Sequence, residues 1–239
     1  MSTNIKTVSI FCLLFIVVFS YLGLQVFAQT ATSNCVITKI GDTGEQKPVL
    51  PPGCANINGP IEGLISPPNL QCRPNGYCQL PESDDGSYVF EPFTPPSERW
   101  GARELVDVIY TVAKQWKQEY PNGRLIIGDL TAYAGHDSHK YGTDVDLDAT
   151  TDGVHWAADF SDWSIYDRDA TVKLGKMFAN TKLIKYIFYN DQPAVDKVLD
   201  YSPGENPSKG MQMFYVVNHH HHFHVRVNVV DLCYVGPDC

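Results

Sequence analysis

Five of the eight histidines in this chain lie within the segment NHHHHFHV, residues 218–225. The end of this segment continues into an alternating apolar run, FHVRVNVV, which predicts a β-strand. Every second side chain of a strand lies on the same face, so His222 and His224 share a face and Phe223 lies on the opposite one, toward the core. Imidazole suits zinc and other borderline transition metals. The pair therefore indicates a metal-binding position.

A row of carboxylates lies in a second predicted strand, DVDLDA at residues 144–149. The same alternation places Asp144, Asp146 and Asp148 on one face and the apolar side chains on the other. Three carboxylates on one face disfavour one another's charged forms unless a cation is close by. The row therefore favours a cation at this face of the strand.

A further histidine precedes the carboxylates in the loop GHDSHKYGTD. His139 lies seven residues before Asp146, and Gly142 between them allows a sharp turn. His139, Asp146 and one histidine of the His222/His224 pair would make a three-ligand zinc site. Such a site keeps a fourth position for water, which is typical of catalytic zinc. Each motif alone is more often an ordinary polar loop or strand face, but together they complement one another as a ligand set.

These ligands need a folded framework, and the rest of the pattern predicts one. Leu105, Ile109 and Val112 recur at helical spacing. Ser97 is the candidate N-cap of this helix, and Pro121 ends it. Strands are expected at residues 124–131, 144–149, 183–190 and 223–230, and further helices at 169–180 and 193–201. The expected class is α+β, with a small, mainly antiparallel sheet, flanking helices and the zinc site on the sheet face.

The start of the chain predicts export. Lys6, a long apolar run and the small residue Ala28 are typical of a secretory signal over residues 1–28. The run is about 20 residues long, close to the length of a membrane-spanning helix, so an uncleaved anchor is the alternative. The rest of the chain is expected to be secreted, extracellular or periplasmic, with stable membrane contact only if this segment is retained. A formal net charge of −9 argues against nucleic acid as a partner, because phosphate contacts need Lys and Arg.

Residues 29–95 are rich in Pro, Gly and Cys and show no sustained periodicity, so we expect a loop-rich segment held by disulfides ahead of a domain over residues 96–239. Six of the seven cysteines follow residue 28, an even number that indicates three disulfides in an exported chain. The equal spacing of Cys72 and Cys78 and of Cys233 and Cys239 favours two local bridges among many pairings.

The segments GDLTAYAGHDSHKYGTDVDLDA and HHHHFHVRV resemble the two signatures of the penicillin-insensitive murein endopeptidases, which belong to the wider group of lysostaphin, D-Ala-D-Ala and hedgehog-type zinc domains. The family pattern is G-H-x-S-H-x-x-G-x-D-V-D, followed near the C-terminus by H-x-x-H-F-H-V-R. The chain matches every fixed position of both. The resemblance covers about residues 98–232 and implies that residues 96–239 form a zinc metallopeptidase domain.

Carried over position by position, the resemblance implies that His139, Asp146 and His224 bind Zn2+. His222 and His219 match active-site histidines of the family. Either would orient the attacking water, accept its proton or stabilise the oxyanion.

Two other positions match the family pattern with supporting roles. His136 is implied as an accessory metal ligand or as a residue that supports a ligand, and Asp144 as a carboxylate that holds His139 or another ligand in its tautomer or has a structural role. His220 and His221 fill variable positions of the pattern.

The implied activity is hydrolysis of peptide cross-links in bacterial peptidoglycan by a zinc-activated water. One alternative is a D,D-carboxypeptidase-like hydrolase of another peptide, which needs a basic pocket for a terminal carboxylate; Lys140 and Arg226 are its nearest candidates. Another is a non-catalytic binding module that keeps its metal for stability. Retention of His219 and His222, which a structural site does not require, favours the enzyme. The sequence has no HExxH, GxSxG, Walker or GxGxxG motif.

Overall fold

The computed structural model describes residues 61, 63–73, 77–131, 139, 142–200 and 212–228. The chain divides into two units, Met1–Cys35 and Val36–Cys239, and all described residues belong to the second. The expected signal segment, the 233–239 bridge, His136 and Lys140 lie outside the described residues. Within those residues, no helix is long and apolar enough to cross a membrane.

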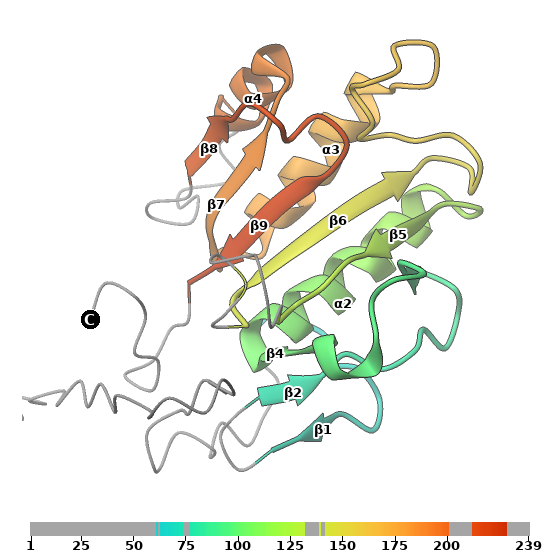
Figure 1. Cartoon of the computed structure of the whole chain (residues 1–239), viewed down its shortest axis with the longest axis vertical. Coiled ribbons are helices and arrows are strands. Elements are labelled where there is room, and N and C mark those ends of the chain that lie inside the picture. Colours follow the sequence, from blue (N-terminus) through green and yellow to red (C-terminus); the bar gives the residue numbers. More distant parts are fainter. Residues whose placement is uncertain are drawn as a thin grey trace, which may run out of the picture. The chain divides into compact units, whose positions relative to one another are not determined.

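The main sheet of the described part has six strands in the order β3-β5-β6-β9-β7-β8 (Figure 1). Their bounds are β3 Tyr88–Phe90, β5 Arg124–Ile127, β6 Asp144–Thr150, β9 Phe223–Val227, β7 Ile184–Tyr189 and β8 Gln212–Tyr215. The three central pairs are antiparallel, whereas β3–β5 and β7–β8 at the two edges are parallel. The predicted α+β class is confirmed, and the sheet is mixed because of its edge strands.

A second, three-stranded antiparallel sheet joins β1 (Gln71–Cys72), β2 (Tyr77–Gln79) and β4 (Trp100–Ala102). Cys72 pairs with Cys78 across β1 and β2, and the two are joined by a disulfide. The predicted local bridge at these two cysteines is therefore confirmed. The segment before residue 96 also supplies β3 to the main sheet and buries Leu80 and Tyr88 in its core.

The helices are α2 (Arg103–Glu119), α3 (Arg168–Asn180) and α4 (Gln192–Leu199). Figure 1 shows α2 and α3 along one face of the sheet. The prediction that Ser97 caps the first long helix was wrong: Ser97 lies in a 3-10 turn, η2 (Pro96–Glu98), and β4 comes before α2. The backbone here bonds to distant partners instead, with the amide of Leu80 donating to the carbonyl of Arg99 and the amide of Ala102 to the carbonyl of Gly142.

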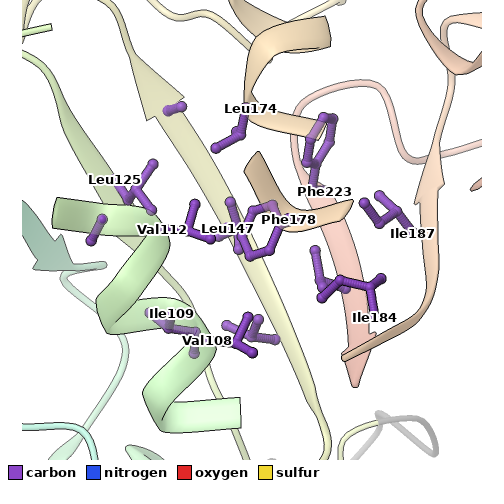
Figure 2. Packing of buried hydrophobic residues seen from close by; sticks show 14 of the residues in the cluster. Val108, Ile109, Val112, Leu125, Leu147, Leu174, Phe178, Ile184, Ile187 and Phe223 are labelled. Atoms are coloured by element: carbon purple, nitrogen blue, oxygen red, sulfur yellow. The ribbon is translucent and has the colours of Figure 1, made fainter. Parts of the chain in front are cut away.

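The core lies between this helical layer and the sheet. Figure 2 shows Val112 of α2 and Phe178 of α3 close to Leu147 of β6, with Val108 of α2 and Phe223 of β9 in the same buried cluster. Burying these side chains supplies the main driving force for folding. Because strand side chains alternate, the apolar side chains of β6 and β9 point into this core and their polar side chains point to the opposite face of the sheet.

Leu147 lies directly between Asp146 and Asp148 in the sequence and is completely buried. We expect Leu147→Ala to lower the free energy of unfolding by about 2–5 kcal/mol, because a cavity adds to the lost apolar contact. The same change at Leu199, which ends α4 and is 48% exposed, should cost less than about 1 kcal/mol. Urea denaturation of both variants makes the comparison. Equal losses would contradict this description of the core.

Candidate metal centre

Two ligand-type side chains are brought together by the pairing of β6 with β9. Asp146 lies directly opposite His224 and Asp144 opposite Arg226. Both pairs point away from the helices, since Val145 and Leu147 on the alternate positions are buried in the core. The alternation predicted from DVDLDA and HFHV therefore places an imidazole and a carboxylate side by side at the middle of the sheet.

The third side chain, His139, comes from the loop before β6. Gly142 shapes its approach to the strand with a φ of +62°, a conformation that glycine adopts without strain. A Cβ on Gly142 would lie 2.4 Å from Cε1 of Tyr77, so the position has no room for a side chain. The amide of Gly142 donates to the carbonyl of His139 at 3.1 Å, which ties the histidine to this turn.

His139, Asp146 and His224 form a group that can hold a metal ion, because one ligand atom from each lies within 4.8 Å of the others. The distance from His139 Nε2 to Asp146 Oδ2 is 3.4 Å, and that from His224 Nδ1 to Asp146 Oδ1 is 2.8 Å. The two rings are 5.0 Å apart and nearly perpendicular. His139 and His224 are buried, and Asp146 is the most exposed of the three, with 20% of its side chain accessible.

Each ligand histidine is held by its other ring nitrogen. His224 Nε2 lies 2.9 Å from Asp144 Oδ1, and His139 Nδ1 lies 2.9 Å from the backbone carbonyl of Asp129. A ring whose far nitrogen donates to an oxygen presents its near nitrogen as a ligand, an arrangement typical of metal-binding histidines. Both near nitrogens face Asp146.

Asp144 is itself fixed on every side. It is completely buried, and Oδ1 accepts a hydrogen bond from Arg226 Nε at 2.6 Å while Oδ2 accepts one from Thr143 Oγ1 at 2.8 Å. Asp144 is thus a buried, hydrogen-bonded carboxylate that orients the ring of His224. The sequence does not predict which histidine Asp144 holds. In the structure Asp144 contacts His224, and His139 contacts the backbone carbonyl of Asp129 instead.

Asp129 was missed by sequence reasoning, because it holds His139 through a main-chain oxygen that every residue possesses. Phe188 was also missed: it lies opposite His224 in the β7–β9 register and stacks on its ring at 5.4 Å. Its apolar face limits how that imidazole can turn. Only the pairing of β7 with β9 brings the two together, and no local motif indicates it.

The charges of the group are strongly coupled in the metal-free protein. Burial lowers the pKa of His224, but the hydrogen bonds and charges of Asp144 and Asp146 outweigh it and raise the pKa to about 9. Burial also lowers the pKa of His139, but the hydrogen bond and charge of Asp146 outweigh burial, so the pKa of His139 is raised. Burial alone would raise the pKa of Asp146, but its two histidine partners lower it. A proton on His224 therefore occupies, at pH 7, a position that a metal ion would take.

The third carboxylate of the row does not join the group. Burial, then Glu91, Asp159 and Asp146, raise the pKa of Asp148 to about 8, so its carboxyl group keeps a proton at neutral pH. Sequence reasoning expected three charged carboxylates; instead Asp144 is paired with Arg226, and the environment of Asp148 favours its neutral form.

Two more histidines lie at the rim of the group. His222 Nε2 is 3.8 Å from Asp146 Oδ1, and the ring of His219 is 5.1 Å from that of His222 and 5.9 Å from that of His224. Burial lowers the pKa of His219, and it lowers that of His222 to about 4. Both rings are thus neutral at pH 7. The structure brings together every expected site residue that it describes.

No family model matches the sequence, and no curated protein matches it.

Asp144 provides a direct test of the centre. We expect Asp144→Asn to weaken metal binding by about 10- to 100-fold, because the amide keeps the shape of the side chain but loses the charge that orients His224 and raises its basicity. Asp152→Asn is the matched control, since Asp152 pairs with His155 in an exposed turn. Calorimetric titration with Zn2+ measures both. Equal affinity in the Asp144 variant and the control would contradict this role for Asp144.

The raised pKa values predict the pH dependence of metal binding. A metal ion must displace the proton that His224 carries at pH 7, because only a nitrogen without hydrogen can coordinate. We expect binding to release protons and affinity to rise with pH up to and through about 9, where His224 is half protonated in the metal-free protein, and to level off above it. Calorimetry in buffers of different ionisation enthalpy counts the protons. Affinity that is constant from pH 7 to about 9 would refute this expectation.

Proposed function

We propose that this protein is a secreted zinc endopeptidase that cuts peptide cross-links of bacterial peptidoglycan. One observation carries the proposal: two neutral histidines, His219 and His222, lie beside a His–Asp–His group that can hold a metal ion. The match to both murein endopeptidase motifs supports the substrate class. The Cys72–Cys78 disulfide supports export, because disulfides persist mainly in oxidising compartments.

The ligand set suits zinc. Two imidazole nitrogens and one carboxylate are typical of catalytic zinc sites, which use three protein ligands. Tetrahedral ligands at about 2.0–2.2 Å from zinc are roughly 3.3 Å from one another, close to the 3.4 Å between His139 Nε2 and Asp146 Oδ2. The 2.8 Å between His224 Nδ1 and Asp146 Oδ1 is shorter and is a hydrogen-bonding distance. When bound, zinc would supply Lewis acidity, which lowers the pKa of a coordinated water from 15.7 to about 7 and polarises a peptide carbonyl.

His222 is the best candidate for moving a proton in this site. Its Nε2 faces Asp146 and its lowered pKa keeps the ring neutral, so Nε2 can accept a proton from a water beside the group. The same nitrogen can then return the proton to the leaving amine. The ring of His219 lies near those of both His222 and His224 and packs edge-on against Phe188. We assign it to binding the substrate carbonyl, since a neutral imidazole can donate a hydrogen bond to that oxygen.

The surroundings favour an endopeptidase over a carboxypeptidase. Arg226, a nearby cation on β9, donates to Asp144 and lies 4.9 Å from the ring of Tyr186. Both contacts engage the guanidinium of Arg226 within the sheet, which argues against a role for Arg226 in binding a terminal carboxylate; Lys140, the other candidate, lies outside the described residues. A metal-stabilised binding module would need neither His219 nor His222.

The proposed reaction is tested with defined muropeptides. We expect the zinc-loaded protein to release the two halves of a cross-linked dimer, identified by mass spectrometry, and chelation to stop the reaction. Release of a single terminal D-alanine without cleavage of the cross-link would instead indicate a carboxypeptidase. Absence of any product from the zinc-loaded protein would contradict the proposal.

His222→Ala separates catalysis from metal binding. We expect the variant to retain zinc, because His222 lies outside the ligand group, and to lose about 10²- to 10⁴-fold in turnover, the usual contribution of a positioned acid–base residue. His155→Ala is the control, as an exposed histidine in a separate turn. Turnover of purified murein and bound zinc are measured for both. Normal turnover in the His222 variant would disprove its assigned role.

A further inference from the structure

The murein endopeptidase motif leaves two of the clustered histidines unexplained, His220 and His221. His221 is exposed and lies next to His222, whose ring borders the centre. The Nδ1 atoms of His221 and His222 are 2.8 Å apart, and their rings are 4.6 Å apart. Two imidazole nitrogens this close must share either a proton or a cation, since otherwise their lone pairs repel.

The two nitrogens of His222 face in different directions. Nε2 faces Asp146, whereas Nδ1 faces His221. The His221 pair is therefore a separate position that shares one ring with the centre. The main group does not include either histidine.

The segment that carries the pair is held at several points. The amide of Asn190 donates to the carbonyl of His219 at 2.9 Å, and the amide of Phe160 donates to the carbonyl of His220 at 2.5 Å. Asn218, at the start of the segment, adopts a φ of +73°. A backbone fixed in this way presents adjacent imidazoles without the ordering cost that a free oligohistidine would pay.

The 2.8 Å between the two Nδ1 atoms is a hydrogen-bonding distance, so a proton is shared there in the metal-free protein. A metal ion can take the place of that proton. Imidazole suits Cu(II), Ni(II) and zinc, and the affinity of a given nitrogen site is highest for Cu(II).

We propose that His221 and His222 form a second metal position, which binds Cu(II) most tightly, beside the His139, Asp146 and His224 group. The ring of His220 lies 4.7 Å from that of His221 and is the nearest further imidazole for the same ion. Solvent completes the coordination, because His221 is exposed. This position requires only the pair geometry. A neutral ring bound through Nδ1 carries its hydrogen on Nε2, so a metal ion here would block the proton-accepting role proposed for His222.

Copper makes the test direct, because Cu(II) is visible by electron paramagnetic resonance and Zn(II) is silent. The full-length, zinc-loaded protein receives one equivalent of Cu(II), is desalted, and is assayed for both metals. We expect one zinc and one copper per chain, with the copper signal split by at least two nitrogens. His221→Ala should bind copper at least tenfold more weakly and keep its zinc.

His155→Ala is the matched control, since His155 is an exposed histidine that contacts Asp152 in another turn. It should retain copper as the wild-type protein does. The proposal is overturned if His221→Ala and the wild type bind copper equally, or if copper in the wild type only replaces zinc. Because the readout is metal binding, loss of the copper site and failure to cleave murein are separate outcomes.

Discussion

The contact between Asp146 and His224 across β6 and β9 is the constraint on which the centre depends. It exists only in one register, because a shift by one residue would turn every side chain of a strand to the other face. Val145 and Leu147 on β6 and Phe223 on β9 fix that register, since all three must face the helices to be buried. The apolar core therefore determines the position of polar ligands that it does not contact.

Assembling these groups at the middle of a sheet has an electrostatic cost that the protein offsets locally. Asp144 is completely buried but accepts hydrogen bonds from Arg226 and Thr143 and lies against His224. Burying one member of such a network without its partners would leave an uncompensated charge. In the metal-free protein the imidazoles bind protons strongly where they face Asp146, so the site already stabilises positive charge at the place where a metal ion would sit.

The sequence predicted best the strands in which apolar and polar residues alternate strictly. In β6 and β9 each apolar residue is followed by a polar one, so the facing of Asp146 and His224 follows from local pattern alone. The start of α2 was mispredicted because Arg99 and Ala102 use their backbone groups for Leu80 and Gly142, which are distant in sequence. The roles of Asp129 and Phe188 were not predicted for the same reason, because Asp129 contacts His139 and Phe188 contacts His224 only in the folded chain. Local pattern identifies ligands, but their supporting residues depend on the assembled fold.

His139, Asp146 and His224 are expected to share one metal ion. An anomalous difference map at the zinc edge, from crystals of the zinc-loaded protein, would locate that ion. We expect a single strong peak about 2.0–2.2 Å from His139 Nε2, His224 Nδ1 and a carboxylate oxygen of Asp146. A peak coordinated by other residues, or no peak between these three side chains, would contradict this expectation.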